Sequence, residues 1–408
     1  MYDFAVLMEW VEFAVRWLHV ITAIAWIGSS FYFIALDLGL RPSNDRRSGV
    51  SGEEWQVHGG GFYHIQKYMI APARMPEDLV WFKWESYTTW LSGFAMLVLV
   101  YYLGGELYLI DPNVLDIPVW QGVLISLGSL GFGWLAYDWI CKSRFGDNNN
   151  RLMVFLFFIL VAMAWGYTQV FSGRAALLHL GAFTATIMTA NVFVTIIPNQ
   201  KIVVADLQAG RDPDAMYGKI AKQRSTHNNY LTLPVIFLML SNHYPLAFAS
   251  SMNWLIAALV FLMGVSIRHY FNTKHARKGS PNWTWLITAI LFLMIAWLST
   301  APMFHDRDEQ AALSPAAQRF ASAEGFEDVH DIILGRCSMC HTAEPYWEGL
   351  VWAPKGVHLD NPNDIARQAR LIYLQSGLTH AMPPGNRTFM EPEERAQIVA
   401  WYQAATGG

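Results

Sequence analysis

The stretch LMVFLFFILVAMAWGYTQVF at residues 152–171 decides the fold. It contains no charged side chain, and as a helix that rises 1.5 Å per residue it is about 30 Å long, which matches the hydrocarbon core of a bilayer. Other stretches between residues 11 and 304 share this length and composition. The predicted spans are 11–36, 84–109, 119–141, 150–171, 174–197, 229–250, 252–272 and 282–303. The sequence therefore predicts a mainly α-helical protein with an eight-span transmembrane bundle.

The composition agrees with a membrane protein. Apolar residues make up 53% of the chain and charged residues 15%, whereas soluble domains carry roughly 25% charged residues. We therefore expect membrane lipid as a partner and no nucleic acid. The segment Met1–Trp10 contains no Lys or Arg, so it lacks the basic region of a cleaved signal peptide, and we expect the first span to be retained.

Lysines and arginines gather in alternate connections between the spans. The basic connections lie at 37–83, 142–151, 201–224 and 268–278. The connections between them hold Arg174 or no basic residue at all. Because basic connections stay in the cytoplasm, the sequence predicts that the N-terminus and the C-terminal region both lie outside.

The chain divides after Phe304, where the composition becomes polar. Residues 1–304 form the predicted membrane domain. Residues 305–325 include Ser314-Pro315 and are predicted to be a linker, because Ser and Pro often interrupt regular structure. Residues 326–408 have the composition of a small soluble domain.

Residues 337–341 read CSMCH, which is the attachment motif of a c-type haem. Cys337 and Cys340 lie one helical turn apart, so they can bond two vinyl groups at one edge of the porphyrin. His341 then projects toward the iron as the proximal ligand. A zinc site would need a second Cys/His pair at ligand spacing, which the sequence does not offer. We therefore expect one covalent haem c in a small class I cytochrome c domain, and attachment of haem c outside the cytoplasm agrees with the predicted topology.

An electron-transfer haem needs a sixth iron ligand. Met382, within HAMPP at residues 380–384, is the best candidate, because two prolines stiffen its loop and His/Met ligation raises the reduction potential. His380 and Met390 are the alternatives. Two amphipathic helices should frame the haem. Their inward residues are predicted to be Phe326, Val329 and Ile333 before the motif, and Ile398 and Trp401 within residues 392–404.

Ionisable and amide side chains near the predicted cytoplasmic side are candidates for a substrate site, because such groups are costly inside a membrane. The candidates are His58, His64, Glu85, His227, Asn228 and Arg268. His58 and His64 flank three glycines whose permissive backbone could fold over a ligand. Arg268 and Glu85 have a second interpretation, since both lie near span ends, where a charged group can reach the interface. A second layer, nearer the outer side, holds Arg16, Tyr167 and Gln169.

His19 and His179 belong to this outer layer. Short matches such as Trp17-Leu18-His19 with Leu177-Leu178-His179 predict a parallel four-plus-four repeat of the spans. The two histidines hold equivalent places in that repeat, so a two-fold arrangement would bring them face to face. They are therefore candidates for binding a second, non-covalent haem or a metal. The alternative is a pair of packing histidines that form hydrogen bonds with neighbouring helices.

Several longer motifs resemble a known family. They are RWLH at 16–19, WIGSSFY at 26–32, WQVHGGGFYH at 55–64 and WFKWE at 81–85, followed by the haem motif. Together they resemble the bacterial membrane-bound urate hydroxylases (urate oxidases), which carry an eight-span domain followed by cytochrome c. The first span is also similar to that of bacterial membrane protoporphyrinogen oxidases, which supports His19 as a ligand of haem b.

The resemblance implies oxidation of urate to 5-hydroxyisourate, with the oxygen taken from water. The electrons would pass to haem c and then to a soluble cytochrome c or a terminal oxidase. It also implies a bacterial inner membrane, with the N-terminus and the cytochrome domain on the periplasmic side. Urate is a planar anion, so its site should offer an Arg, amide groups for its edge and an aromatic face. The released protons call for a His or carboxylate base.

Other functions fit parts of the sequence. The chain could be a membrane-anchored electron-transfer cytochrome c subunit of a respiratory complex, although one span would suffice for anchoring. A transporter with a redox-sensing tail is favoured only by the repeat. A haem–copper oxidase subunit would need adjacent histidines, and no His-His pair occurs.

Overall fold

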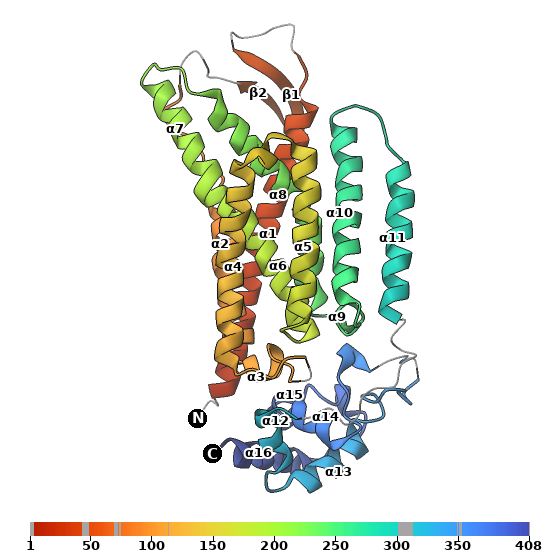
Figure 1. The fold of residues 1–408 in the computed structure, drawn as a ribbon. Coiled ribbons are helices and arrows are strands. Elements are labelled where there is room, and N and C mark those ends of the chain that lie inside the picture. The colour runs from red at the N-terminus through yellow and green to blue at the C-terminus, as the bar shows by residue number, and fades with distance from the viewer. Residues whose placement is uncertain are drawn as a thin grey trace.

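The computed structural model describes residues 4–42, 49–68, 72, 75–112, 114–300, 313–348, 350 and 353–407. Helices dominate it, which confirms the mainly α-helical class (Figure 1). Six helices of the described part are long and apolar enough to cross a membrane, which indicates a membrane protein. These six comprise α1 (Phe4–Gly39), α4 (Val119–Lys142), α5 (Asn149–Thr168), α6 (Gly173–Ala190) continued by η3 (Asn191–Ile196) and α7 (Ile197–Gln208), α10 (Asn253–His275) and α11 (Trp283–Thr300).

Two of the eight predicted spans take another form. In the predicted span 84–109, the helix α2 (Trp84–Met96) turns into the π-helix η1 (Leu97–Tyr102) and is followed by the short α3 (Gly105–Tyr108). The predicted span 229–250 lies partly in α8 (Ala215–Ser241), which begins earlier and has a polar first half. Both elements pack inside the bundle, α2 against α1 and α6, and α8 against α6 and α10. The count of eight spans and the four-plus-four repeat therefore stay predictions.

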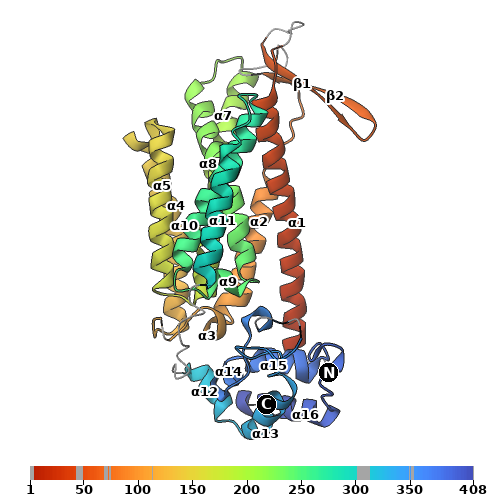
Figure 2. The same ribbon diagram turned by 90° about the vertical axis from the view of Figure 1, so that its right-hand side faces the viewer.

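The two ends of the bundle differ (Figures 1 and 2). One end carries the beginning of α1 and the C-terminal domain, and we call it the domain end. The opposite end carries the strands β1 (Val50–His58) and β2 (Gly61–Tyr68), and we call it the hairpin end. The connections α4–α5, α7–α8 and α10–α11 also lie at the hairpin end, so the described basic connections gather on one side of the bundle. Which side faces the cytoplasm stays a prediction.

The WQVHGGGFYH motif forms an antiparallel hairpin rather than an irregular loop. Its register pairs Trp55 with His64 and His58 with Gly61. Gly59 and Gly60 form the turn with φ of +59° and +80°, the left-handed backbone that a two-residue hairpin turn requires. The hairpin projects away from the helices in Figure 2.

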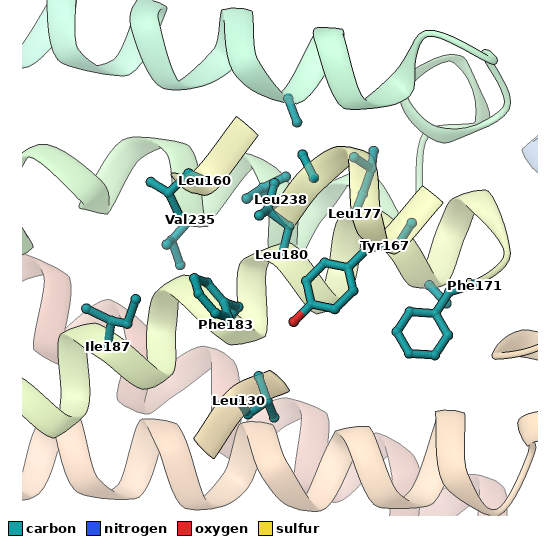
Figure 3. Close-up of a cluster of buried hydrophobic side chains, with 14 of the residues drawn as sticks. Leu130, Leu160, Tyr167, Phe171, Leu177, Leu180, Phe183, Ile187, Val235 and Leu238 are labelled. Carbon is teal, nitrogen blue, oxygen red and sulfur yellow. The ribbon is translucent and has the colours of Figure 1, made fainter. Parts of the chain in front are cut away.

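The core of the bundle lies between α4, α5, α6 and α8 (Figure 3). Large side chains from these helices interlock, and the Tyr167 hydroxyl lies 2.7 Å from the Ser129 hydroxyl. Gly133 allows α4 to approach the ring of Phe183 so closely that a Cβ there would collide with it. The labelled core residues include Leu130, Leu160, Tyr167, Phe171, Leu177, Leu180, Phe183, Ile187, Val235 and Leu238.

The C-terminal domain is a separate small helical unit with its own core. Its main elements are α12 (Pro315–Ala321), α13 (Phe326–Arg336), α14 (Pro362–Arg367), α15 (Ala369–Ile372), η6 (Tyr373–Leu378) and α16 (Pro392–Thr406). The predicted inward residues pack into this core: Val329, Ile333, Ile398 and Trp401 are buried and Phe326 packs against them. This confirms the two helices and their inward residues, while the haem that they would frame stays a prediction.

The linker predicted over 305–325 is partly wrong. Ser314 and Pro315 start the helix α12 instead of breaking structure, because the Ser314 hydroxyl accepts the Ala317 N–H and Pro315 occupies the first turn. Phe320 is buried in the domain core, and its carbonyl accepts the indole N–H of Trp401 at 3.0 Å. The domain therefore begins before residue 326. Residues 305–312 lie outside the described part of the chain.

Candidate functional site

The CSMCH motif occupies the turn that follows α13. The N–H of Cys340 and the N–H of His341 both donate to the Cys337 carbonyl, at 3.2 and 3.0 Å, which brings the three side chains onto one turn. Both thiols are unpaired, and Cys337 is buried against the domain core. Burial raises the pKa of the Cys337 thiol to about 12, so the unmodified thiol is neutral. The turn has the spacing that two thioether bonds to one porphyrin need.

The His341 ring is oriented for metal binding. Its Nδ1 lies 2.9 Å from the Val357 carbonyl, and a carbonyl can only accept, so Nδ1 carries the proton. The other nitrogen, Nε2, is therefore left with the lone pair that a haem ligand uses. The donor set of two thiols and one oriented imidazole fits haem c, whose presence stays a prediction.

The structure separates the two candidate methionine ligands. Met390 is buried in the domain core with 2% of its surface exposed. Met382 is only half-buried, and its backbone is fixed on both sides. Its N–H donates to the Gln375 carbonyl at 2.8 Å, and Arg395 donates to its carbonyl at 2.9 Å. A free thioether on an anchored loop favours Met382, and His380 is exposed beside it.

We expect Met382→Ala to keep the haem covalently attached and to abolish His/Met coordination. The loss of the thioether lowers the reduction potential, because His/Met ligation raises it. The measurement is the near-infrared methionine–iron absorption band of the oxidised protein, which should vanish. Met390→Ala is the matched control and should keep the band. The opposite pattern would mean that Met390 is the ligand.

An ion pair ties α13 to α16 in the same domain. Arg336 donates to both carboxylate oxygens of Glu394 at 3.0 Å, and Glu394 also accepts the Glu391 N–H in a capping box. Partial burial opposes ionisation of Glu394, but the hydrogen bonds from Arg336 and Glu391 outweigh it and hold the pKa of Glu394 below its ordinary value of 4.5. The pair therefore stabilises the domain at neutral pH, and this stabilisation is lost as the pH falls from 4.5 through the lowered pKa.

We expect Glu394→Gln to lower the free energy of unfolding by about 0.5–1 kcal/mol at pH 7. Gln can still complete the capping box, so the difference reports the charge pair. The difference should shrink as the pH falls below 4.5 through the lowered pKa of Glu394, because the carboxylate of the parent chain is then protonated as well. Denaturation followed by haem absorbance measures both values. Glu393→Gln, on the exposed neighbouring residue, is the control, and an equal loss there would refute the pairing argument.

A cavity of about 320 Å³ lies between α1, the segment before α2, η3 and α8. We call it the α1–α8 pocket. Its walls combine flat aromatic rings with amide, hydroxyl and carboxylate groups. The aromatic and polar lining residues are Trp26, Phe33, Trp81, Phe82, Ser29, Ser30, Asp37, Gln200, Ser225, Asn228 and Thr232. The π-helical η3 forms one wall, and such turns often occur at functional sites. The volume and lining suit a small planar polar molecule.

Asn228 connects this pocket to a buried polar network. Its Oδ1 accepts from Asn191 at 3.0 Å, and its Nδ2 donates to the Met188 carbonyl at 2.9 Å. Asn191 also donates to the Tyr137 hydroxyl, which lies 2.7 Å from Nδ1 of His227. The whole network is buried, so Asn228 is held in one orientation.

A second pair of groups lies beside this network. Arg224 pairs with Asp138 at 2.7 Å and places its guanidinium 4.8 Å from the Tyr137 ring. Asp138 also binds the exposed Lys142. Three buried nitrogen atoms in this region have no protein partner. They are Nε2 of His227 and Nε and Nη1 of Arg224. Polar groups buried in this way need a partner, and water or substrate can supply it.

The six substrate-site candidates do not form one cluster. Asn228 lines the pocket and His227 supports it from behind. Arg268 is buried elsewhere, where it donates to Asn229 at 2.7 Å and lies over the Phe31 ring. Glu85 sits half-buried in the first turn of α2 and is not among the residues that line the pocket.

His58 and His64 are held by the hairpin, away from the pocket. His64 stacks on Trp55 and lies 2.9 Å from Glu53, while His58 is exposed at the turn. The segment is a hairpin rather than an irregular loop, and the expectation that it folds over a ligand stays a prediction. Sequence reasoning missed the pocket walls Trp81 and Phe82, although both lie within a motif that carries the family resemblance.

A second cavity, of about 560 Å³, lies between α4, α5, α8 and α10. Its polar lining residues are Ser129, Tyr137, His227 and Tyr230, and the rest of its walls are apolar. A polar purine would lose its hydrogen bonds to water there and regain few of them. The smaller α1–α8 pocket is therefore the better candidate for a polar substrate.

His19 and His179 lie nearer the domain end, in different settings. Nδ1 of His19 is 3.0 Å from the Thr89 carbonyl, and Gly93 leaves space for the imidazole against α2. Nδ1 of His179 is 2.8 Å from the Ala175 carbonyl, and its ring packs 4.5 Å from Phe171. Both therefore leave Nε2 free, as a haem or metal ligand needs. In the described part of the chain no ring contact joins them.

The C-terminal domain contacts the domain end through charged residues. Arg370 lies 3.1 Å from Glu9 and 3.6 Å from Glu12, both on α1. Arg319 lies 3.5 Å from Glu106 on α3. The haem motif therefore sits in a domain that docks beside the start of the first helix.

The fold is that of a helical membrane protein with a cavity of about 320 Å³ in its bundle and a helical domain at one end. The profile of the family described as "Urate oxidase N-terminal" matches residues 5–299. The chain belongs to this urate oxidase N-terminal family, which indicates an oxidoreductase of urate-related oxidation. The C-terminal domain lies outside the matched residues. Searches of curated proteins and of solved structures returned no significant match.

Proposed function

We propose that the chain hydroxylates urate with water and passes the electrons to haem c in its own C-terminal domain. The reaction is urate + H₂O → 5-hydroxyisourate + 2 H⁺ + 2 e⁻. The observation that carries the proposal is the joining of a urate oxidase family domain to a CSMCH motif in one chain. A soluble cytochrome c or a terminal oxidase would take the electrons onward.

The α1–α8 pocket supports the binding step. Trp26, Trp81 and Phe82 offer flat faces on which a purine can stack. The amide of Asn228 has one N–H committed to Met188 and a second that remains for the edge of the substrate. Because its orientation is fixed by Asn191, Asn228 can select the hydrogen-bonding edge of one purine over another.

The protons released by the reaction need an acceptor. Asp37 is the one carboxylate among the described residues that line the pocket, and it forms an ion pair with Lys67 of β2. A carboxylate at hydrogen-bonding distance of attacking water would act as a general base. We assign this role to Asp37.

Cys337, Cys340 and His341 would hold haem c, with Met382 as the sixth ligand. When bound, that haem supplies a one-electron acceptor at the domain end. Urate gives up two electrons, so a second one-electron site in the bundle would let both leave in quick succession. His19 and His179 are the candidates for such a site, as ligands of a haem b or a metal, because each keeps Nε2 free. A pyridine haemochrome spectrum with a b-type component that His19→Ala or His179→Ala removes would support this role. A pure c-type spectrum at one haem per chain would refute it.

The decisive experiment adds urate to membranes that contain the chain, under strictly anaerobic conditions. We expect the c-type haem to become reduced within seconds to minutes, whereas xanthine, a purine without the 8-oxo group, leaves it oxidised. The alternative function, a membrane-anchored electron-transfer cytochrome c subunit, predicts reduction by a partner complex and none by urate.

A further inference from the structure

We propose that urate oxidation by this chain is split across the bundle. Urate enters and its protons leave at the hairpin end, whereas the electrons leave at the domain end. Each turnover then moves negative charge through the bundle, which is an activity beyond the chemical conversion. The inference rests on the proposed function, and the tests below separate the two.

The α1–α8 pocket lies in the half of the bundle near the hairpin end. On α1 its lining runs from Trp26 to Asp37, two residues before the helix ends at Gly39. Asp37 is 45% exposed and pairs with Lys67 of the hairpin, whose side chain is 38% exposed. This pair marks the side on which the pocket meets solvent. A water-soluble anion reaches the pocket from that side.

An apolar core lies in the bundle on the side of the domain end. Between the pocket and the domain end, α6 contributes Leu180 and Phe183, and α8 contributes Val235 and Leu238 (Figure 3). All four are buried. These apolar side chains oppose the passage of a urate anion toward the domain end.

The electrons must cross this layer if they reach the C-terminal domain. Trp26 of the pocket and Glu12, which contacts Arg370 of the C-terminal domain, are separated on α1 by a rise of about 21 Å. His19 and His179 lie at intermediate depth. The charge movement therefore spans much of the membrane thickness.

The stoichiometry of urate oxidation sets the direction in which charge moves through the bundle. Water supplies the oxygen that bonds to C5 of urate, two protons pass by way of Asp37 to the hairpin side, and two electrons pass singly to the domain side. There a soluble one-electron acceptor, such as a cytochrome c, removes them. If the basic hairpin end faces the cytoplasm, a membrane potential that is negative inside accelerates the reaction.

The first test uses the full holoprotein in sealed liposomes, with soluble cytochrome c added only outside. Only molecules with an outward C-terminal domain can then reduce it. We expect reduction when urate is trapped inside and none when urate is outside only. Reduction by outside urate alone would overturn the inference while leaving the proposed function intact. If detergent-solubilised protein also fails to reduce cytochrome c with urate, the proposed function itself is wrong.

The same liposomes report protons and potential. The pH-sensitive dye pyranine, trapped inside, should report that the interior gains one proton for each cytochrome c reduced. A valinomycin-set potential of 100 mV, positive outside, should raise the rate about sevenfold if one electron crosses half of the field in the rate-limiting step. External acidification with an unchanged rate would overturn the charge movement.

The last test needs no haem. Gln200→Cys places a thiol in the pocket, and Lys201→Cys places one on the exposed neighbouring position, both on a background in which Cys141, Cys337 and Cys340 are replaced by Ala. An impermeant maleimide should label both from the hairpin side, and urate should slow labelling of Gln200→Cys at least fivefold without protecting Lys201→Cys. Labelling of Gln200→Cys from the domain side would overturn the assignment of the entrance.

Discussion

Replacing both haem-attachment cysteines, Cys337→Ala with Cys340→Ala, should reduce urate-dependent electron transfer to the background rate. Without the two thioether bonds the chain cannot retain a covalent haem, and the electrons have no exit at the domain end. The α1–α8 pocket is remote from the motif, so urate binding should persist. Turnover with soluble cytochrome c and equilibrium binding of labelled urate measure the two properties separately.

Cys141→Ala is the matched control for this change. Cys141 is a buried free cysteine at the end of α4, so its replacement removes a thiol without touching the haem motif. We expect full haem content and full turnover. Undiminished urate oxidation in the double variant would show that electrons leave by another route, and the role of the C-terminal domain would have to be abandoned.

Asn228→Leu should raise the KM for urate about 10- to 100-fold. The change keeps the volume of the side chain and removes the amide that faces the pocket. It also leaves the buried Nδ2 of Asn191 with one partner fewer. A lost hydrogen bond in a buried site costs about 1–3 kcal/mol, which corresponds to this range. Steady-state kinetics with urate measures the effect.

Asn229→Leu is the control on the adjacent residue. Asn229 accepts from Arg268 and is not among the residues that line the pocket. The KM of this variant should stay within about twofold of the parent. If Asn229→Leu raises the KM and Asn228→Leu does not, the substrate lies beside Arg268 rather than in the α1–α8 pocket.

The sequence could predict elements whose signal is local. An apolar run such as 152–171 can cross a bilayer only as a helix, because the lipid offers no hydrogen-bond partners and each backbone N–H and C=O must find one within the helix. The CSMCH motif and the two helices around it are equally local, and the predicted inward residues Ile333 and Trp401 are indeed buried.

Elements that depend on tertiary contacts could not be predicted in the same way. The first half of α8 is polar, so hydropathy places its start too late, and its polar residues are stabilised by partners such as Asp138 on α4. Ser314 and Pro315 suit both a breaker and a helix start, and only burial of Phe320 decides between them. The pocket is harder still, because it combines α1, residues 80–82, η3 and α8. No spacing in the sequence reveals that proximity.

The charged pairs between the two domains have a consequence for how the C-terminal domain finds its place. Glu106 and Arg319 are more than half exposed, and Arg370 faces two glutamates across a partly wet surface. Exposed pairs of this kind contribute about 0–1 kcal/mol each and weaken in salt. Such a contact could not hold two free molecules together. Because one chain carries both partners, the local concentration of the C-terminal domain beside the bundle is set by covalent connection, in the millimolar range for a short tether. Weak contacts then suffice for docking, and the same weakness lets the domain release the bundle whenever a soluble partner competes for its surface.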